Sequence, residues 1–343
     1  MDGAKGKTVL IIGATGAVGA HAAVIMKQHG YRVYAVGRRT SDNGFFEEHG
    51  IPYFSVDVRD SSAFNSLPTD VDAVIHLAGS MPAKMEGYRM QEYVDSIVTG
   101  TINVLEYIRR IGCRKIIFGH SIADIVYKFG TTEPIDDDSE RRPPLNTDHS
   151  VYSICKNTAV DLILHYREKY GIAGYVLRFP TIYLYRPSPF YYVDGVKKWM
   201  GFRYIIEQAK KGNTLEVWGN PDSIKETIYI KDLVHLMECC VNSETCSGGV
   251  FNAGTGMPIS IHDQIKAIAE VFAPASGKSE IVFKPDKPSS PQFVLSIEKA
   301  RRELGYSPQY SFKMWLVDFK QEMETEPYGK LWGYGREYYL PED

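Results

Sequence analysis

The stretch TVLIIGATGAVGA, residues 8–20, decides the fold. Four of its first five residues are apolar, as expected for a buried strand. Gly13, Gly16 and Gly19 follow at once, and the run from Ala17 to His29 continues with helical spacing. Glycines let a backbone approach a pyrophosphate, and a helix N-terminus offers it free N–H groups. The order strand, glycine turn, helix therefore predicts a dinucleotide site.

Strand and helix patterns alternate through the first half of the chain. Five buried strands are expected, at Thr8 to Ile12, Arg32 to Val36, Tyr53 to Val56, Ala73 to Leu77 and Lys115 to Phe118. Helices are expected at Ala17 to His29, Met90 to Ile111 and Tyr152 to Tyr170, and a sixth strand at Tyr175 to Phe179. Such alternation predicts an α/β fold with a Rossmann-like, doubly wound parallel sheet.

The sequence pattern changes at the end of this sixth strand, where the run RFPTIYLYRPSPFYYVDG is rich in proline and tyrosine. We expect residues 1–180 together with 225–256 to form the cofactor-binding domain. Residues 181–224 together with 257–343 would form a smaller α/β C-terminal substrate lobe. At 343 residues the chain is long enough for both.

Composition favours a small-molecule partner. The net charge of −3 argues against a broad basic surface that would bind nucleic acid or an anionic membrane. No signal peptide and no apolar run of roughly 18 residues is visible, so a soluble protein outside the membrane is expected. The five cysteines lack CxxC or metal-ligand spacing, which favours the cytoplasm and gives no metal site.

The second strand ends in VYAVGRR, where an acidic residue would bind the adenosine ribose of NAD. Gly37, Arg38 and Arg39 stand there instead. Guanidinium groups bind phosphate through charge-assisted, often bidentate hydrogen bonds. This favours NADP as the cofactor, with NAD as the second choice.

The sequence VYSICK places Tyr152 and Lys156 four residues apart, on one face of a helix. A phenol titrates near pH ~10, so it needs a nearby cation to work as an acid or base at neutrality. Lowering its pKa to about 7 asks for roughly 4 kcal/mol from such cations. Tyr152 is the candidate proton carrier and Lys156 the candidate cation.

These motifs together resemble the extended short-chain dehydrogenase/reductase superfamily, in particular the NAD-dependent epimerase/dehydratase family of nucleotide-sugar 4-epimerases and 4-ketoreductases. The spacing GxxGxxG, the HLAG of residues 76–79 and the segments LRFPTIY, LEVWG and KARRELGYSP carry the resemblance over most of the chain. It implies catalytic roles for Ser121, Tyr152 and Lys156. It also implies a homodimer formed through a helix bundle.

The resemblance assigns further contacts by position. Cofactor contacts besides the glycines, the two arginines, Tyr152 and Lys156 would be Thr15, Ala17, Val18, Asp57, Val58, Leu77, Ala78, Gly79, Phe179 and Thr181. Substrate contacts would be Ser80, Met81, His120, Ser121, Thr181, Tyr183, Val217 and Lys225. The role of His120 is open, because relatives often carry a serine there.

The chain departs from its relatives at several positions. Ile122 and Ala123 replace the Asp-Glu pair of dehydratases, which disfavours water elimination. Ile97 replaces an asparagine expected in the proton relay. Lys225 and Glu226 stand where an Arg-Asp pair would meet a diphosphate, so a nucleotide sugar is expected but its identity is not readable.

We expect hydride transfer at a sugar carbon, by a 4-ketoreductase consuming NADPH or by a 4-epimerase retaining its cofactor. A reductase of a non-nucleotide carbonyl compound would explain the missing phosphate arginines. The alternative outside the enzymes is a protein that binds a dinucleotide as a sensor and catalyses no reaction, because a fold does not by itself guarantee catalysis.

Overall fold

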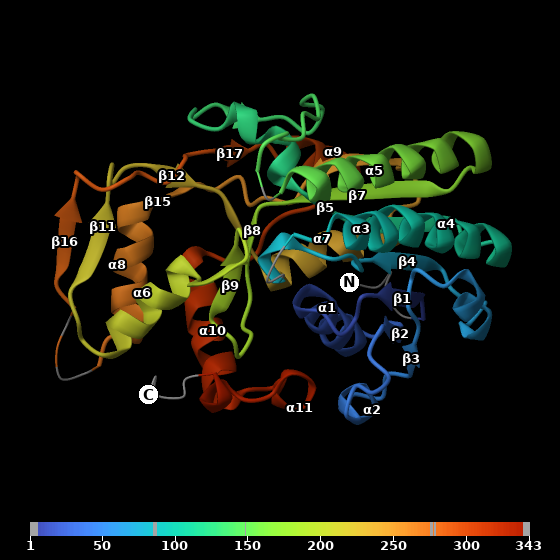
Figure 1. Ribbon diagram of the computed structural model, residues 1–343, viewed down its shortest axis with the longest axis horizontal. Coiled ribbons are helices and arrows are strands. Elements are labelled where there is room, and N and C mark those ends of the chain that lie inside the picture. Colours follow the sequence, from blue (N-terminus) through green and yellow to red (C-terminus); the bar gives the residue numbers. More distant parts are fainter. Residues whose placement is uncertain (1–5, 85–87, 148, 275–276, 278, 339–343) are drawn as a thin grey trace.

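The computed structural model describes residues 6–84, 88–147, 149–274, 277 and 279–338. Its centre is a seven-stranded sheet in the order β14-β7-β5-β4-β1-β2-β3, with every neighbouring pair parallel (Figure 1). The strands are β1 (Thr8–Ile12), β2 (Arg32–Gly37), β3 (Tyr53–Ser55), β4 (Ala73–His76), β5 (Lys115–Ser121), β7 (Ala173–Phe179) and β14 (Gly248–Asn252). The predicted doubly wound α/β fold is confirmed.

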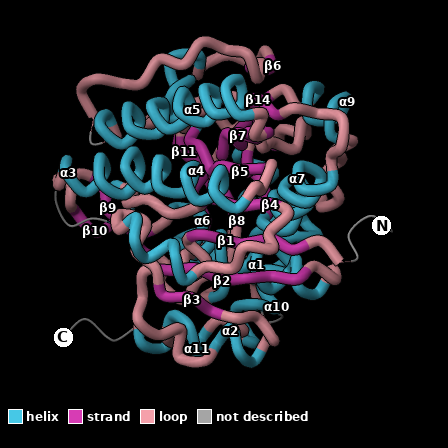
Figure 2. Tube along the Cα trace, turned by 90° about the vertical axis from the view of Figure 1, so that its right-hand side faces the viewer, coloured by secondary structure: helices cyan, strands magenta, loops and turns pink. Residues whose placement is uncertain are grey.

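Helices cover both faces of this sheet (Figure 2). On one face α1 (Ala17–Gln28) packs against α7 (Ile230–Asn242), and on the other α4 (Gly100–Ile111) packs against α5 (Ser150–Tyr170). The sheet residues between these layers are almost completely buried, because parallel strands are covered by crossover helices on both sides. The carboxyl ends of β1, β4 and β5 therefore open at one common edge.

The helix expected from Met90 to Ile111 is interrupted. It consists of α3 (Met90–Tyr93), a π-helical segment (Val94–Thr99) and α4. Ile97, in the position expected to hold asparagine, is buried in this segment and packs on Gly79. π-Helical turns are frequent at functional sites, and here the turn persists without the asparagine.

Outside the central sheet the chain forms two-stranded sheets and further helices. The hairpin β9 (Phe190–Val193) and β10 (Val196–Trp199) is antiparallel, and β11 (Leu215–Trp218) pairs with β16 (Ile281–Lys284) in parallel. Further pairs are β8 (Thr181–Tyr183) with β13 (Thr227–Tyr229), β12 (Ile224–Lys225) with β15 (Ile259–Ser260), and β6 (Pro134–Ile135) with β17 (Val294–Leu295). The helices are α6 (Gly201–Lys210), α8 (Ile261–Phe272), α9 (Glu298–Leu304) and α10 (Phe312–Thr325).

The C-terminal part of the described chain returns to the helices beside the central sheet. Helix α11 (Gly329–Trp332) lies beside α1 and the short α2 (Phe45–Glu48) in Figure 1. The ring of Tyr328, just before α11, lies 4.1 Å from that of His21 in α1 and 5.7 Å from that of Phe45 in α2. This return brings residues from the far end of the sequence to the glycine turn.

Candidate active site

The glycine turn is shaped by close backbone packing. Gly13 has φ +94°, and a Cβ there would lie 2.7 Å from the amide nitrogen of Ala78. A Cβ on Gly19 would lie 2.3 Å from the carbonyl oxygen of Gly13. Helix α1 then begins at Ala17 with neither a capping side chain nor an acidic residue in its first turn. Its open N–H groups fit the diphosphate of a dinucleotide.

The two arginines after β2 differ in their contacts. A Cβ on Gly37 would lie 2.8 Å from the Thr15 side chain, so an acidic side chain there would have to displace Thr15. Arg38 is exposed, and no described residue forms an ion pair or hydrogen bond with its guanidinium. Arg39 instead donates to the carbonyl oxygen of Leu331 at 2.6 Å. Arg38 is therefore the more open of the two to a 2′-phosphate.

The other predicted cofactor contacts lie along the same sheet edge. Asp57 accepts hydrogen bonds from Arg59, and this contact holds the pKa of the Asp57 carboxyl below its usual range. Val58 is buried, with its side chain against Gly100. The rim is completed by Leu77, Ala78, Gly79, Phe179 and Thr181, all partly accessible.

The three predicted catalytic residues meet between β5 and α5. Ser121 ends β5, and its Oγ accepts a hydrogen bond from the backbone N–H of Ala123 at 3.2 Å. Tyr152 and Lys156 lie one turn apart on α5, with Lys156 Nζ 6.0 Å from the centre of the Tyr152 ring. Lys156 Nζ also donates to the carbonyl oxygen of Gly119 at 2.7 Å. One helix face and one strand end thus place a hydroxyl, a phenol and an ammonium together.

Burial controls the protonation of this group. Burial raises the pKa of Tyr152 to about 12, and the neighbouring Ser121 hydroxyl offsets part of that rise. Burial lowers the pKa of Lys156 to about 7. Without a bound ligand, the protein therefore favours the neutral phenol of Tyr152. The lowered phenol pKa expected from the sequence needs a further positive charge beside Tyr152.

His120 lies behind Ser121 in a fully buried network. Its Nε2 donates to Asp124 at 3.0 Å, and Arg178 contacts both oxygens of the same carboxylate at 3.2 Å. Arg178 also donates to the side-chain oxygen of Asn252 at 2.9 Å. His120 is only 2% exposed, so its side chain is not open to a substrate. Its contacts instead support the backbone next to Ser121.

Two predicted substrate contacts have their side chains in the core. Tyr183 is buried, with its ring stacked 4.5 Å from that of Trp315, and Val217 is completely buried in the same core. Their side chains stabilise the second lobe, because alternate residues of β8 and β11 face inward. Only the backbone of Val217 is left for a ligand.

The remaining predicted substrate residues lie nearer the cleft. Ser80 donates its backbone N–H to Ser96 Oγ at 3.0 Å, which ties the loop after β4 to the π-helical segment. Met81 is exposed, while Lys225 is partly buried, and burial lowers the pKa of its ammonium. Glu226 is fully buried and accepts from Thr255, so it serves the fold.

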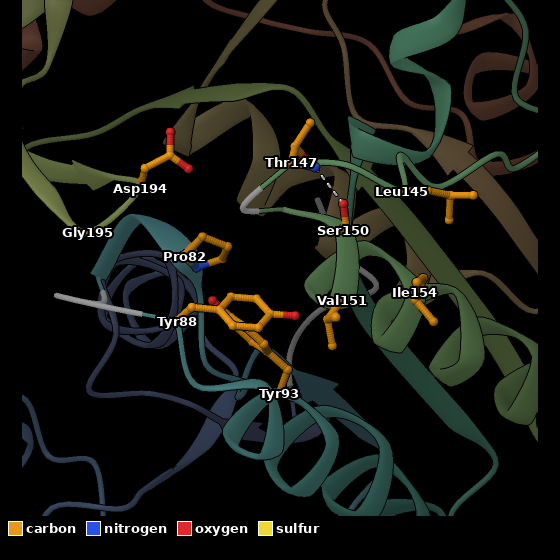
Figure 3. Close-up of a pocket in the computed structure, with 10 residues that line it drawn as sticks. All are labelled: Pro82, Tyr88, Tyr93, Leu145, Thr147, Ser150, Val151, Ile154, Asp194 and Gly195. Carbon is orange, nitrogen blue, oxygen red and sulfur yellow. Dashed lines mark hydrogen bonds between the residues drawn. The ribbon is translucent and has the colours of Figure 1, made fainter.

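A cavity of about 430 Å³ opens beside the N-terminus of α5 (Figure 3). Its lining residues are Pro82, Tyr88, Tyr93, Leu145, Thr147, Ser150, Val151, Ile154, Asp194 and Gly195. The predicted catalytic residues do not line it, but the rings of Tyr93 and Tyr152 lie 6.1 Å apart. The cavity thus borders the catalytic group through Tyr93.

Comparison with known proteins decides the family. Residues 9–254 match the model of the NAD dependent epimerase/dehydratase family. The chain belongs to this family. The match covers the sheet, the glycine turn and the predicted catalytic residues, so the predicted nicotinamide-dependent enzyme of the extended type is confirmed.

Members of the epimerase/dehydratase family resemble the chain over nearly its whole length. It is 25% identical to UDP-glucose 4-epimerase 2 of Oryza sativa subsp. japonica, covering 94% of this chain and 83% of the relative. It is 25% identical to UDP-glucuronate 4-epimerase 4 of Arabidopsis thaliana, covering 92% and 75%.

Solved structures show the same fold. UDP-N-acetylglucosamine 4-epimerase from Bacillus cereus superposes with a TM-score of 0.74 at 19% identity, covering 93% of this chain and 96% of that one. UDP-glucuronic acid 4-epimerase from Bacillus cereus, in complex with UDP-glucuronic acid and NAD, gives 0.69 at 22%, covering 92% and 99%. In the described part of this epimerase/dehydratase member, no helix is both long and apolar enough to cross a membrane.

Residues that the sequence analysis missed also lie near this site. Trp332 contacts the glycine turn, and Tyr328 packs on His21 of α1. No local signal marks them, because each depends on a contact between distant segments.

Proposed function

We propose that the chain catalyses reversible hydride transfer at a hydroxyl or keto carbon of a nucleotide-activated sugar, as a 4-epimerase. The observation that carries this proposal is the meeting of Ser121, Tyr152 and Lys156 at the open edge of the sheet. The named relatives, which are UDP-glucose and UDP-glucuronate 4-epimerases, support the substrate class.

Each catalytic residue has a distinct task. The Ser121 hydroxyl holds the reacting oxygen, and Tyr152 takes its proton or returns one. Lys156, when protonated, favours the phenolate of Tyr152. The glycine turn and the N-terminus of α1 would hold a dinucleotide, which would supply the hydride chemistry. Burial of Tyr152 and Lys156 limits access of water to the reacting carbon.

For the cofactor we propose NADP first and NAD second. The exposed guanidinium of Arg38 supports NADP, as does Gly37, where an acidic side chain would have to displace Thr15. The family name and the NAD-bound Bacillus cereus structure support NAD.

We further propose the predicted division into a cofactor domain and a substrate lobe, and a homodimer formed through α4 and α5. Ile102 on α4 and Ile154 on α5 are 38% and 40% exposed, as expected for side chains awaiting a partner. Thr181 and Lys225 are proposed to meet the nucleotide sugar.

The test measures retained cofactor and turnover together. Acid denaturation of the purified protein, followed by chromatography against NAD, NADH, NADP and NADPH, is expected to release near-stoichiometric dinucleotide. Incubation with UDP-glucose or UDP-glucuronate is expected to give the 4-epimer. The Tyr152→Phe variant should keep the dinucleotide and lose nearly all turnover, and unchanged turnover would refute this mechanism.

A 4-ketoreductase is the second candidate, supported by Arg38. It predicts little retained cofactor and consumption of NADPH with a 4-keto sugar nucleotide.

A further inference from the structure

A buried carboxylate holds the segment that follows the predicted catalytic serine. Asp124 lies in a 3₁₀ helix (Ile122–Lys128) that begins directly after Ser121, and its side chain is completely buried. His120 Nε2 donates to Asp124 at 3.0 Å, and Arg178 donates to both carboxylate oxygens at 3.2 Å. His120 of β5 and Arg178 of β7 are direct partners across the parallel sheet, so both reach the carboxylate together. Asp124 therefore fixes the 3₁₀ helix to the ends of two strands.

The first turn of this 3₁₀ helix holds the hydroxyl of Ser121. Ser121 is the N-cap residue, and its Oγ accepts a hydrogen bond from the backbone N–H of Ala123. Ala123 directly precedes Asp124, so the contacts of Asp124 limit where this N–H can point. Because Oγ accepts this bond, its own hydrogen remains for the reacting oxygen or for Tyr152. The orientation of the Ser121 hydroxyl thus depends on Asp124.

The residue on the other side of His120 holds the ammonium of Lys156. Lys156 Nζ donates to the carbonyl oxygen of Gly119 at 2.7 Å. Gly119, His120 and Ser121 are consecutive at the end of β5, and successive side chains of a strand point to opposite faces of the sheet. The His120 side chain can therefore be held from the opposite face without entering the site. Its contact with Asp124 fixes the peptide groups on both sides of His120.

Stability alone does not account for a histidine at this position. His120 Nδ1 is buried, and it has no hydrogen-bond partner among the described residues. An unpaired buried nitrogen costs stability, and an aliphatic side chain of similar size would avoid that cost. The imidazole instead supplies the Nε2–H donor to Asp124, which an aliphatic side chain lacks. The contribution of His120 is therefore this contact.

We propose that His120 and Asp124 are positioning residues for hydride transfer. Held by Arg178, they keep the Ser121 hydroxyl and the acceptor of the Lys156 ammonium in place. Neither residue touches the substrate or the cofactor, and no proton passes through them. A displaced hydroxyl or ammonium slows the reaction, because proton transfer needs the groups within hydrogen-bond reach of each other.

The position of the Ser121 hydroxyl affects Tyr152 as well as turnover. The effect on turnover rests on the proposed function. The effect on Tyr152 does not, because the Ser121 hydroxyl offsets part of the rise in the pKa of Tyr152, and a displaced hydroxyl should raise that pKa further. Ionisation of Tyr152 can be followed in protein saturated with NAD or NADP, without any sugar nucleotide. The positioning role and the proposed function can therefore fail separately.

The variants keep or remove single parts of the contact. His120→Leu removes the donor to Asp124, whereas His120→Gln offers an amide N–H at a similar reach. Asp124→Asn removes the charge and keeps one acceptor oxygen. Asp232→Asn is the control for lost stability, because this buried carboxylate of α7 accepts the backbone N–H groups of Gln309 and Tyr310 instead.

Each variant is measured in four ways. Urea unfolding gives its stability, and fluorescence titration gives its affinity for NADH and NADPH. kcat and KM are measured for 4-epimerisation of UDP-glucose by the dinucleotide-bound protein. Ionisation of Tyr152 is followed by ultraviolet difference spectra against the same protein carrying Tyr152→Phe.

We expect His120→Leu and Asp124→Asn to lower kcat about tenfold or more and to move the ionisation of Tyr152 to higher pH, with KM and dinucleotide affinity within about twofold of the wild type. His120→Gln should recover most of kcat. Asp232→Asn should lose stability without either effect. Unchanged kcat and Tyr152 ionisation in His120→Leu would overturn the proposal, and so would an equal loss of kcat in Asp232→Asn. If the wild type converts no sugar nucleotide, the proposed function fails, and the shift of Tyr152 ionisation alone supports the positioning role or, by its absence, overturns it.

Discussion

The indole nitrogen of Trp332 donates a hydrogen bond to the carbonyl oxygen of Thr15 at 3.0 Å, across 317 residues of sequence. Trp332 stacks on Tyr328, which in turn packs on His21 of α1. Arg39 adds a second tie from the end of β2 to the carbonyl oxygen of Leu331. The C-terminal segment therefore supports the glycine turn from outside and fixes the orientation of its peptide groups.

Trp332→Phe tests this support. The phenyl ring keeps most of the stacking on Tyr328 but loses the N–H donor, a loss of about 1 kcal/mol for a typical hydrogen bond. We expect dinucleotide affinity to fall about three- to tenfold, with kcat at saturating cofactor nearly unchanged. Trp218→Phe is the control, because Trp218 is half exposed and its indole donates only to the nearby Glu216. Equal effects of the two variants would contradict the supporting role.

The two arginines after β2 should behave differently. Arg38→Ala should weaken NADP binding at least tenfold and NAD binding less than twofold, because only the 2′-phosphate needs this guanidinium. Arg39→Ala should weaken both cofactors by a similar, smaller factor, since it loosens Leu331 rather than a phosphate contact. Titration of both variants with both dinucleotides gives the four dissociation constants to compare. Equal losses in Arg38→Ala would exclude a 2′-phosphate site there.

The buried network behind Ser121 should contribute to stability. Asp124→Ala leaves the fully buried Arg178 without its carboxylate, which costs about 3–5 kcal/mol for a broken buried ion pair. Urea unfolding of the cofactor-free protein measures this loss. Asp161→Ala, which removes the exposed partner of Arg141, should cost at most about 1 kcal/mol. A similarly small effect of Asp124→Ala would show that the network is not needed for folding.

The sequence was informative where structure is local. The apolar run Thr8–Ile12 with its glycines predicted the first strand and helix, and the spacing of Tyr152 and Lys156 placed both on one face of α5. The sequence does not show, by contrast, whether a tyrosine side chain points into the core or toward a ligand. Tyr183 was expected at the substrate and instead packs on Trp315. Contacts such as Trp332 with Thr15 depend on how the two lobes meet, which no local periodicity encodes.

Lys156 should make stability depend on pH. Its pKa is about 7 in the folded protein against an ordinary value of 10.5, so between these values the unfolded chain holds a proton that the folded protein lacks. The free energy of unfolding therefore rises with pH across this window, and the full cost of burying the ammonium is present below pH 7. Lys156→Met removes this titration. In urea unfolding of cofactor-free protein at about pH 6, 8 and 9.5, the stability of the variant relative to the wild type should be highest at the lowest pH and decline upward. The exposed Lys169→Met should give a difference that does not change with pH. A pH-independent difference for Lys156→Met as well would mean that the ammonium is not desolvated in the folded protein.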